Sequence, residues 1–149
     1  MKILVDADGC PVVEETIRTA KRFSLSVLLV CDTSHEMRRQ GAETLIVSKG
    51  ADSADFALVG RAERGDIVVT QDYGLAAMAL ARGARPVNQN GMRYTRENID
   101  ALLMDRHLSA KARRAGGRTR GPSRRRPEQD EAFLRELEAL CREDGEAET

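Results

Sequence analysis

The sequence contains no tryptophan and few other aromatic residues, with three Phe and two Tyr among 149 residues. Its core must therefore be built from Val, Leu, Ile, Ala and Met, a composition that favours layered α/β folds. The same scarcity argues against RNA-binding domains that stack bases on aromatic side chains, such as RRM and OB-fold domains.

Cysteine is also scarce. The three cysteines, Cys10, Cys31 and Cys141, include no Cys-x-x-Cys pair. An odd number without paired spacing supports neither a disulfide framework nor a zinc site. Cys10 stands beside Pro11 at a predicted helix start, where thiols are often activated, but no partner base lies nearby in the sequence. We therefore expect Cys10 to have a packing role.

Long hydrophobic runs are missing as well. No stretch reaches the roughly 20 apolar residues needed to span a membrane. The opening run, Met-Lys-Ile-Leu-Val-Asp, is too short for a signal peptide. We therefore expect a cytoplasmic protein without a membrane partner. No feature of the sequence fixes the oligomeric state.

The 24 basic and 24 acidic residues balance to zero net charge, but they are segregated along the chain. Residues 1–105 carry 13 basic and 15 acidic residues. Residues 106–126 carry nine basic residues and no acidic ones, whereas residues 127–149 carry two basic and nine acidic residues. The middle segment, Arg106 to Arg126, is the strongest candidate for contact with the phosphate backbone of RNA. Such runs are more often solubilising tails, and the acidic residues that follow could compete for the same arginines.

Four apolar runs have the length of strands and lack polar alternation, as is typical of strands covered on both faces. They are Lys2–Val5, Ser26–Cys31, Thr44–Val47 and Asp66–Thr70. Helical patterns follow or separate them over Pro11–Phe23, Asp52–Arg64 and Tyr73–Arg82. This alternation predicts an α/β fold with a mostly parallel sheet and right-handed crossovers.

A further short strand is expected after Gly83, because Asn90-Gly91 between two short extended runs indicates a hairpin turn. The sheet would then have four to five strands. Thr95 is a suitable N-cap for a helix that runs to about Arg106, although Glu97 is one place early for a capping box.

The composition changes to Arg, Gly, Ser and Pro from Ser109 to Pro127, which predicts a flexible basic segment. A helical pattern returns over Glu128–Arg142, with a frayed acidic end after it. We therefore divide the chain into an α/β domain over residues 1–107, a flexible segment over 108–127 and a C-terminal amphipathic helix over 128–149.

Five aspartates follow the ends of predicted strands. Asp6 and Asp8 come after the first strand, Asp52 and Asp55 begin the helix after the third, and Asp72 follows the fourth. Ligands of open α/β sheets bind beyond the carboxyl ends of the strands, and residues two apart in an extended chain point the same way. We therefore expect these side chains to converge.

Carboxylates brought together without a cation repel one another or acquire a raised pKa. Oxygen ligands of this kind suit Mg²⁺ or Mn²⁺, and the chemistry of such a site is phosphoryl transfer or phosphodiester hydrolysis. The five aspartates are the candidate catalytic residues. The expected metal ligands among them are Asp6, Asp8, Asp55 and Asp72.

Three of the aspartates also have a structural explanation, whereas Asp6 ends an apolar strand with no capping role. Asp52 and Asp72 could be helix N-caps, and Asp8 before Gly9 could belong to a turn. Capping and metal ligation are compatible roles. The two histidines, His35 and His107, lie near predicted helices away from this edge, so no histidine-based site competes.

Five parts of the sequence form a recognisable set of motifs: Val5–Pro11, Gly50–Asp55, Arg64–Ala76, Asn88–Gly91 with Tyr94-Thr95, and the Gly-Gly-x-x-x-Gly-Pro stretch ending at Pro122. Together they resemble the YaiI/YqxD family of uncharacterised bacterial proteins. The resemblance implies a PIN-like, doubly wound α/β domain with helices on both faces of the sheet. Better-known members of that fold are metal-dependent ribonucleases with an acidic cluster. The resemblance therefore implies a Mg²⁺- or Mn²⁺-dependent nuclease acting on RNA.

Two alternative functions stay open. An apolar strand ending in Asp-x-Asp-Gly also opens haloacid-dehalogenase-like phosphatases, in which Asp6 would be the nucleophile and Asp8 the acid/base. Against this, Cys10 stands where those enzymes usually carry Thr or Val. The other alternative is a non-catalytic PIN-like module that binds RNA or a protein through its basic segment.

Overall fold

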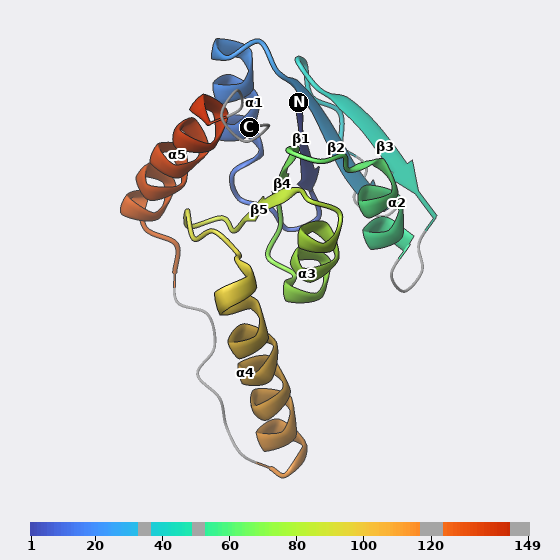
Figure 1. Cartoon of the computed structure of the whole chain (residues 1–149), viewed down its shortest axis with the longest axis vertical. Helices are drawn as coiled ribbons and strands as arrows, with labels where there is room; N and C mark the ends of the chain where they lie inside the picture. Colours follow the sequence, from blue (N-terminus) through green and yellow to red (C-terminus); the bar gives the residue numbers. More distant parts are fainter. Residues whose placement is uncertain (33–36, 49–52, 117–123, 144–149) are drawn as a thin grey trace.

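Five parallel strands form one sheet at the centre of the molecule (Figure 1). The computed structural model describes residues 1–32, 37–48, 53–116 and 124–143. The strand order is β3-β2-β1-β4-β5. The strands are β1 (Lys2–Asp6), β2 (Ser26–Asp32), β3 (Glu43–Val47), β4 (Ile67–Val69) and β5 (Arg85–Val87). The predicted parallel α/β sheet is confirmed, with strand ends shifted by one or two residues.

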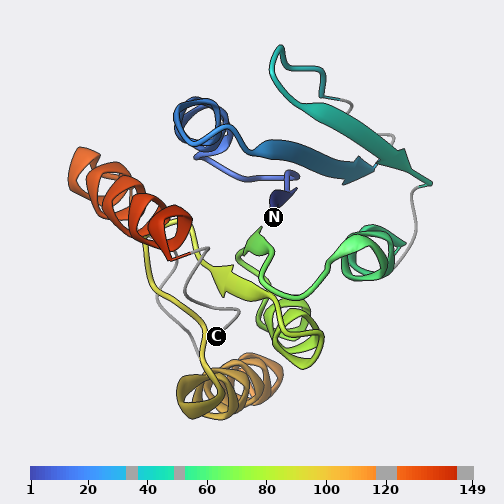
Figure 2. The same cartoon turned by 45° about the horizontal axis from the view of Figure 1, so that its top comes forward.

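Helices cover both faces of this sheet (Figure 2). The described helices are α1 (Val13–Arg22), α2 (Ser53–Arg61), α3 (Tyr73–Ala81), α4 (Arg96–Arg114) and α5 (Pro127–Arg142). α1 and α5 pack on one face, and α2 and α3 pack on the other. The doubly wound arrangement is therefore confirmed. None of the described helices is long and apolar enough to cross a membrane.

Alternating side chains of β1 supply both halves of the core. Ile3 and Val5 face α1 and α5, while Leu4 faces α2 and α3. All three are fully buried, as expected of a central strand that carries apolar residues on both faces. Phe133 of α5 is the largest of the fully buried side chains, so the C-terminal helix is part of the core.

Helix α4 is longer than predicted. It begins after Thr95, the predicted N-cap, but the reciprocal capping partner is Asn98 and not Glu97: Asn98 N donates to Thr95 Oγ1 at 3.1 Å, and Thr95 N donates to Asn98 Oδ1 at 2.8 Å. The helix continues to Arg114 because Ala and Lys/Arg are strong helix formers, and basic residues in the last turn stabilise the helix dipole.

The predicted flexible segment is therefore helical as far as residue 114. At its other end, Arg125 donates to Gln89 O at 2.7 Å and to Asn90 Oδ1 at 2.8 Å, so this arginine is fixed against the turn after β5. The middle of the predicted segment, residues 117–123, lies outside the described residues.

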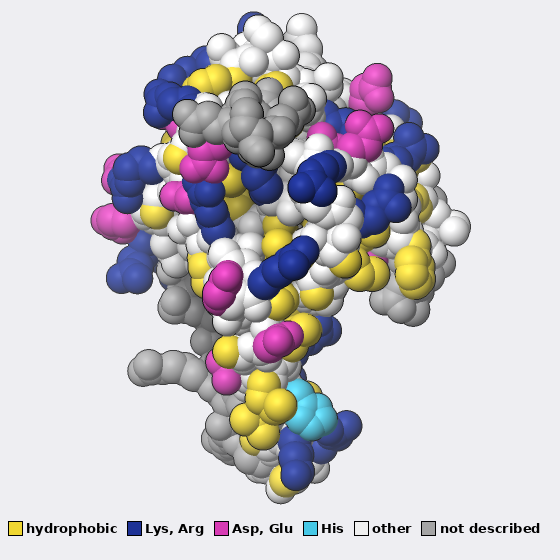
Figure 3. All heavy atoms as spheres, viewed as in Figure 1, with side chains coloured by type: hydrophobic (Ala, Val, Ile, Leu, Met, Phe, Trp, Pro, Cys, Tyr) yellow, Lys and Arg dark blue, Asp and Glu magenta, His cyan; other side chains and the backbone are white. Residues whose placement is uncertain are grey.

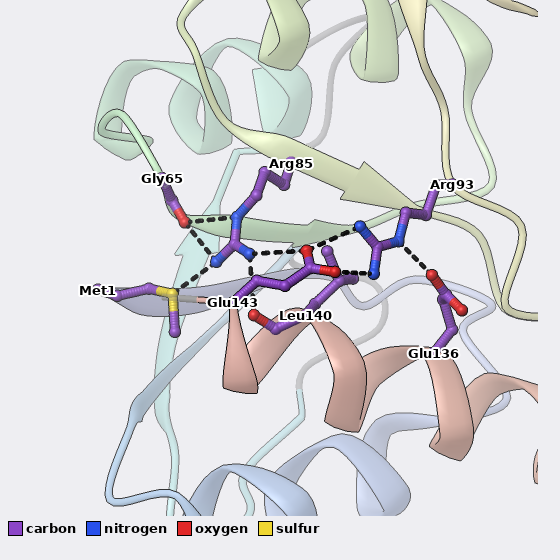
Figure 4. A network of polar contacts seen from close by, with 7 residues as sticks. All are labelled: Met1, Gly65, Arg85, Arg93, Glu136, Leu140 and Glu143. Carbon is purple, nitrogen blue, oxygen red and sulfur yellow. Dashed lines mark hydrogen bonds and ion pairs between the residues drawn. The ribbon is translucent and has the colours of Figure 1, made fainter. Parts of the chain in front are cut away.

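Two arginines near the β5 edge hold the C-terminal end of α5 (Figure 4). Arg85 donates to Gly65 O at 2.8 Å and to Leu140 O at 2.8 Å. Arg93 donates to both carboxylate oxygens of Glu143, at 2.8 and 2.9 Å, and also binds Glu136. The hydrogen bonds from Arg93 lower the pKa of Glu143. These charged bonds fix the helix that supplies Phe133 to the core.

The predicted hairpin turn is present, with Asn88 N donating to Met92 O at 2.9 Å and an antiparallel bridge between Val87 and Arg93. Gly91 in this turn has a φ of 85° and touches the backbone of α5. A Cβ atom at this position would lie 2.5 Å from Ala132 O. Glycine is therefore required here both by conformation and by packing.

We predict that Gly91→Ala destabilises the protein more than Gly65→Ala, measured by urea unfolding. Gly65 also has a positive φ, of 87°, but an added Cβ would meet nothing within 4 Å. Gly65→Ala should cost about 1–2 kcal/mol from backbone strain alone. Gly91→Ala should cost about 1–3 kcal/mol more, because α5 must move away from the turn. Equal losses for the two variants would show that α5 does not rest on this glycine.

Candidate functional site

A pocket of about 460 Å³ opens at the carboxyl ends of β1 and β4. At this point the chain order of the sheet reverses, since β2 lies on one side of β1 and β4 lies on the other. Such a switch point is where doubly wound proteins bind ligands. The lining residues are Asp6, Asp8, Gly9, Gln71, Asp72, Tyr73 and Arg106.

Asp6 is the last residue of β1, and its Oδ2 accepts a hydrogen bond from Thr70 Oγ1 at 2.9 Å. Burial raises the pKa of Asp6 from 3.8 to about 6, even though the Thr70 hydrogen bond lowers it. The charges of Asp55, Asp72 and Asp8 raise it further. The charged form of this half-buried carboxyl group is therefore disfavoured in the folded protein.

Asp8 follows β1 and turns toward β2. Its Oδ2 accepts a hydrogen bond from Asp32 N at 3.1 Å, which ties the loop after β1 to the end of the neighbouring strand. Asp32 therefore also lies at the carboxyl edge of the sheet, and the sequence analysis missed it. The rule that selected Asp6, an aspartate directly after an apolar run, would have selected Asp32 as well.

Asp72 has both of the roles considered for it. Its Oδ1 accepts hydrogen bonds from Gly74 N at 2.8 Å and Leu75 N at 3.2 Å, so it is the N-cap of α3. It also lines the pocket, where the Arg106 guanidinium lies 3.5 Å from the same Oδ1. The capping bonds fix the orientation of this carboxylate toward the pocket.

The other two predicted aspartates come from the start of α2. Asp55 lies in its first turn, and its charge acts on Asp6, but Asp55 does not line the pocket. Asp52 lies outside the described residues, as does His35. Within the described part of the chain, no group of three His, Cys, Asp or Glu side chains is already arranged to hold a metal ion.

Two residues that support the pocket belong to the family motifs but were not predicted as site residues. Tyr94 is buried, and its hydroxyl donates to Thr70 O at 3.0 Å. Gln71 Nε2 donates to Gly9 O at 3.0 Å and joins the loops after β4 and β1. Thr70 follows a predicted strand, but its pairing with Asp6 and Tyr94 depends on how distant segments meet in the fold.

Cys10 is half-buried beside the pocket and packs against the core. Burial raises the pKa of its thiol to about 11, and the Asp6 and Glu15 charges act in the same direction. A thiol with this pKa is protonated at neutral pH and is a weak nucleophile. The packing role expected for Cys10 is the one that its surroundings favour.

The fold and the pocket define a doubly wound α/β protein with an acidic site at the switch point of its sheet. A family model described as "Uncharacterized BCR, YaiI/YqxD family" matches residues 4–143. The chain therefore belongs to the YaiI/YqxD family, as the sequence motifs predicted.

Similar proteins occur in several bacteria under the description UPF0178 protein. One from Exiguobacterium sibiricum is 52% identical over 143 residues, which cover 96% of this chain and 98% of the relative. One from Ruminiclostridium cellulolyticum is 50% identical over 137 residues, covering 92% of this chain and 90% of the relative. No solved structure matches the chain significantly. The assignment to the PIN-like fold stays a prediction.

We predict that Asp6→Asn stabilises the metal-free protein at alkaline pH. Because the folded pKa of about 6 exceeds the ordinary value of 3.8, the folded state is penalised once the carboxyl group ionises. The gain should be about 2 kcal/mol near pH 8 and should vanish below about pH 4, where Asp6 is protonated in both states. Urea unfolding in the presence of a chelator measures both values.

Glu131→Gln, at an exposed position of α5, is the control and should change stability little at any pH. If Asp6→Asn changes the free energy of unfolding equally at pH 4 and pH 8, the pKa of Asp6 is not raised in the folded protein.

Proposed function

We propose that this protein hydrolyses phosphodiester bonds of RNA in a reaction that depends on Mg²⁺ or Mn²⁺. The observation that carries the proposal is the convergence of Asp6, Asp8 and Asp72 in one pocket, with Arg106 beside them. Acidic and basic groups at one site suit a substrate whose phosphate is bound through both a cation and a guanidinium.

The donor set suits a hard divalent cation. All candidate ligand atoms are carboxylate oxygens, and burial together with the charges of the neighbouring aspartates raises the pKa of Asp6, so a bound cation would relieve the cost of ionising it. Mg²⁺ keeps several waters and binds through one or two carboxylates, so a preformed cage of three ligands is not required. Asp6, Asp8, Asp55 and Asp72 would hold the ion directly or through water.

When bound, Mg²⁺ or Mn²⁺ would activate water and stabilise charge on the attacked phosphate. The chain's own residues would keep the carboxylates in place. Thr70 fixes the Asp6 carboxylate and is itself held by Tyr94, while the α3 N-terminus fixes Asp72. One of the carboxylates would orient the attacking water. Such support from neighbouring residues is what a precise catalytic site needs.

Helix α4 offers a path for the rest of the RNA. Arg106 lines the pocket, and Arg113 lies seven residues further along, close to the same face of the helix. Both side chains belong to exposed residues. Guanidinium groups spaced along one face would bind successive phosphates and make the affinity dependent on salt. These two residues belong to the basic segment, Arg106 to Arg126, that the sequence analysis proposed for RNA.

We predict that Asp6→Asn lowers Mn²⁺-dependent cleavage of single-stranded RNA by at least about 100-fold. The variant removes one charge from the proposed metal site but keeps an oxygen that can accept the Thr70 hydrogen bond. Cleavage of an end-labelled oligonucleotide measures the rate, and circular dichroism verifies the fold.

Glu131→Gln should cleave at the wild-type rate. Cleavage by Asp6→Asn at that rate would trace the activity to a contaminating nuclease. Calorimetry provides a second readout: wild-type protein should bind Mn²⁺ at millimolar concentrations, and absence of binding would contradict the proposal. A stable metal-fluoride adduct on Asp6 would instead favour a phosphatase with Asp6 as nucleophile.

We predict that Arg106→Ala raises KM for RNA about tenfold and weakens the salt dependence of binding. The Arg106 guanidinium is largely exposed and only 3.5 Å from Asp72, so it can move to a substrate phosphate. Arg106→Lys should retain the salt dependence but recover only part of the affinity, since Lys cannot bind phosphate bidentately. Unchanged KM in Arg106→Ala would exclude a substrate-binding role.

A further inference from the structure

Helix α4 projects from the body of the molecule (Figure 1). It carries apolar side chains on two opposite faces. Its inner face places Ile99, Leu102 and Leu103 in a cluster with residues of α3. Its outer face carries Met104 and Leu108, which are 56% and 54% exposed. The four exposed large hydrophobic residues of the described chain are Met1, Phe56, Met104 and Leu108.

Two of these four residues therefore lie on one helix face, one turn apart, and the fold leaves them uncovered. Among the described residues, no other pair of exposed large hydrophobic side chains has this spacing. An exposed apolar stripe on a projecting helix is typical of an interaction surface.

The charges along α4 are ordered from one end to the other. After Arg96, its first residue, the acidic residues Glu97, Asp100 and Asp105 lie in its first half. Arg106 and the last-turn residues Lys111, Arg113 and Arg114 follow them. On the projecting part of the molecule in Figure 3, exposed hydrophobic side chains lie between acidic side chains nearer the body and basic side chains toward the free end. The helix surface is therefore acidic at one end, apolar in the middle and basic at the other.

We infer that the outer face of α4 binds the same face of a second copy of this chain, with the two helices antiparallel. Met104 of each copy then packs against Leu108 of the second copy. With that register, Asp100 of each copy lies beside Lys111 of the second copy, since Lys111 follows Leu108 by three residues on the same face. The arrangement has a two-fold axis, so each apolar contact and each ion pair occurs twice.

The order of the charges favours this occupant over others. A parallel pair would place acidic ends together and basic ends together, and like charges on facing helices repel. RNA on this outer face would meet the carboxylates of Asp100 and Asp105, unlike RNA on the face of Arg106 and Arg113. A membrane surface selects helices with Lys and Arg on the polar face, whereas here Asp100 and Asp105 flank the apolar stripe. An antiparallel copy complements both ends of the helix at once.

The contact is small, because each copy contributes a single helix face. Stable interfaces bury about 1,200–2,000 Å² in total, and one helix on each side falls toward the low end of that range or below it. We therefore expect association in the micromolar range. The inference does not rest on the proposed function, since the outer face of α4 is opposite the face that carries Arg106.

Sedimentation equilibrium of the full chain, from about 1 μM to about 1 mM at low salt, tests the inference. The wild-type protein should pass from monomer to dimer over this range. Leu108→Asp should weaken the dimer at least about tenfold, because it places a charge in the apolar stripe. Phe56→Asp is the matched control: Phe56 is 67% exposed but lies on α2, and its substitution should leave the dimer constant unchanged.

Charge reversal tests the orientation. Asp100→Lys and Lys111→Asp should each weaken the dimer, and the double variant should restore the wild-type constant, since it exchanges the partners of the ion pair. Asp105 of each copy lies close to Asp105 of the second copy, near the two-fold axis. Asp105→Asn should therefore remove a repulsion between like charges and tighten the dimer.

A monomer at every concentration would overturn the inference, as would a dimer unaffected by Leu108→Asp. A double charge variant weaker than both single variants would exclude the antiparallel arrangement. Unfolding curves of each variant separate loss of association from loss of fold. RNA cleavage is measured separately, so failure of the dimer and failure of the proposed nuclease activity are distinguishable.

Discussion

The central position of β1 is the constraint on which the rest of the structure depends. Its neighbours are β2 on one side and β4 on the other, so the chain winds outward in both directions from this strand. Its side chains must be apolar toward both faces, and its carboxyl end must open at the switch point. Asp6 is placed at that end, where burial by the layers on both sides acts on its carboxyl group.

The pocket is built at some cost to stability. A carboxyl group whose pKa is raised to about 6 is one that the fold disfavours in its charged form. An apolar side chain would end a buried strand without this penalty. Residues that break a local rule of stability often serve function, and here the penalty falls on a residue that no cap or turn requires.

The supports of the pocket connect it to distant parts of the chain. Asp6 is hydrogen-bonded to Thr70, Thr70 accepts from Tyr94, and Tyr94 precedes the N-cap of α4. α4 then returns Arg106 to the pocket, 3.5 Å from Asp72. The acidic residue Asp6 and the basic residue Arg106 are thus connected through Thr70, Tyr94 and the start of α4, although they are far apart in the sequence.

Much of this fold could be predicted from the sequence, because β1, β2 and β4 read as apolar runs and Pro11, Thr95 and Gly83 mark helix boundaries. The convergence of Asp6, Asp8 and Asp72 followed from the rule that ligands bind at the carboxyl ends of parallel strands. The Thr70–Tyr94 bond could not be predicted, since it depends on tertiary packing. The length of α4 was missed because an Arg-rich composition indicates disorder as readily as it indicates a helix.

The family assignment was predicted from motifs that span the chain, and the family model matches residues 4–143. The chemistry of the site is a separate matter, because one fold supports many functions. The central claim is that the carboxylates at the switch point hold a divalent cation.

Anomalous diffraction from a crystal soaked in Mn²⁺ tests that claim most directly. The account predicts a peak in the pocket, with oxygen atoms of Asp6 and at least one other aspartate at about 2.1 Å. A pocket without a peak, in crystals that are saturated with Mn²⁺ and leave the pocket open to solvent, would contradict it.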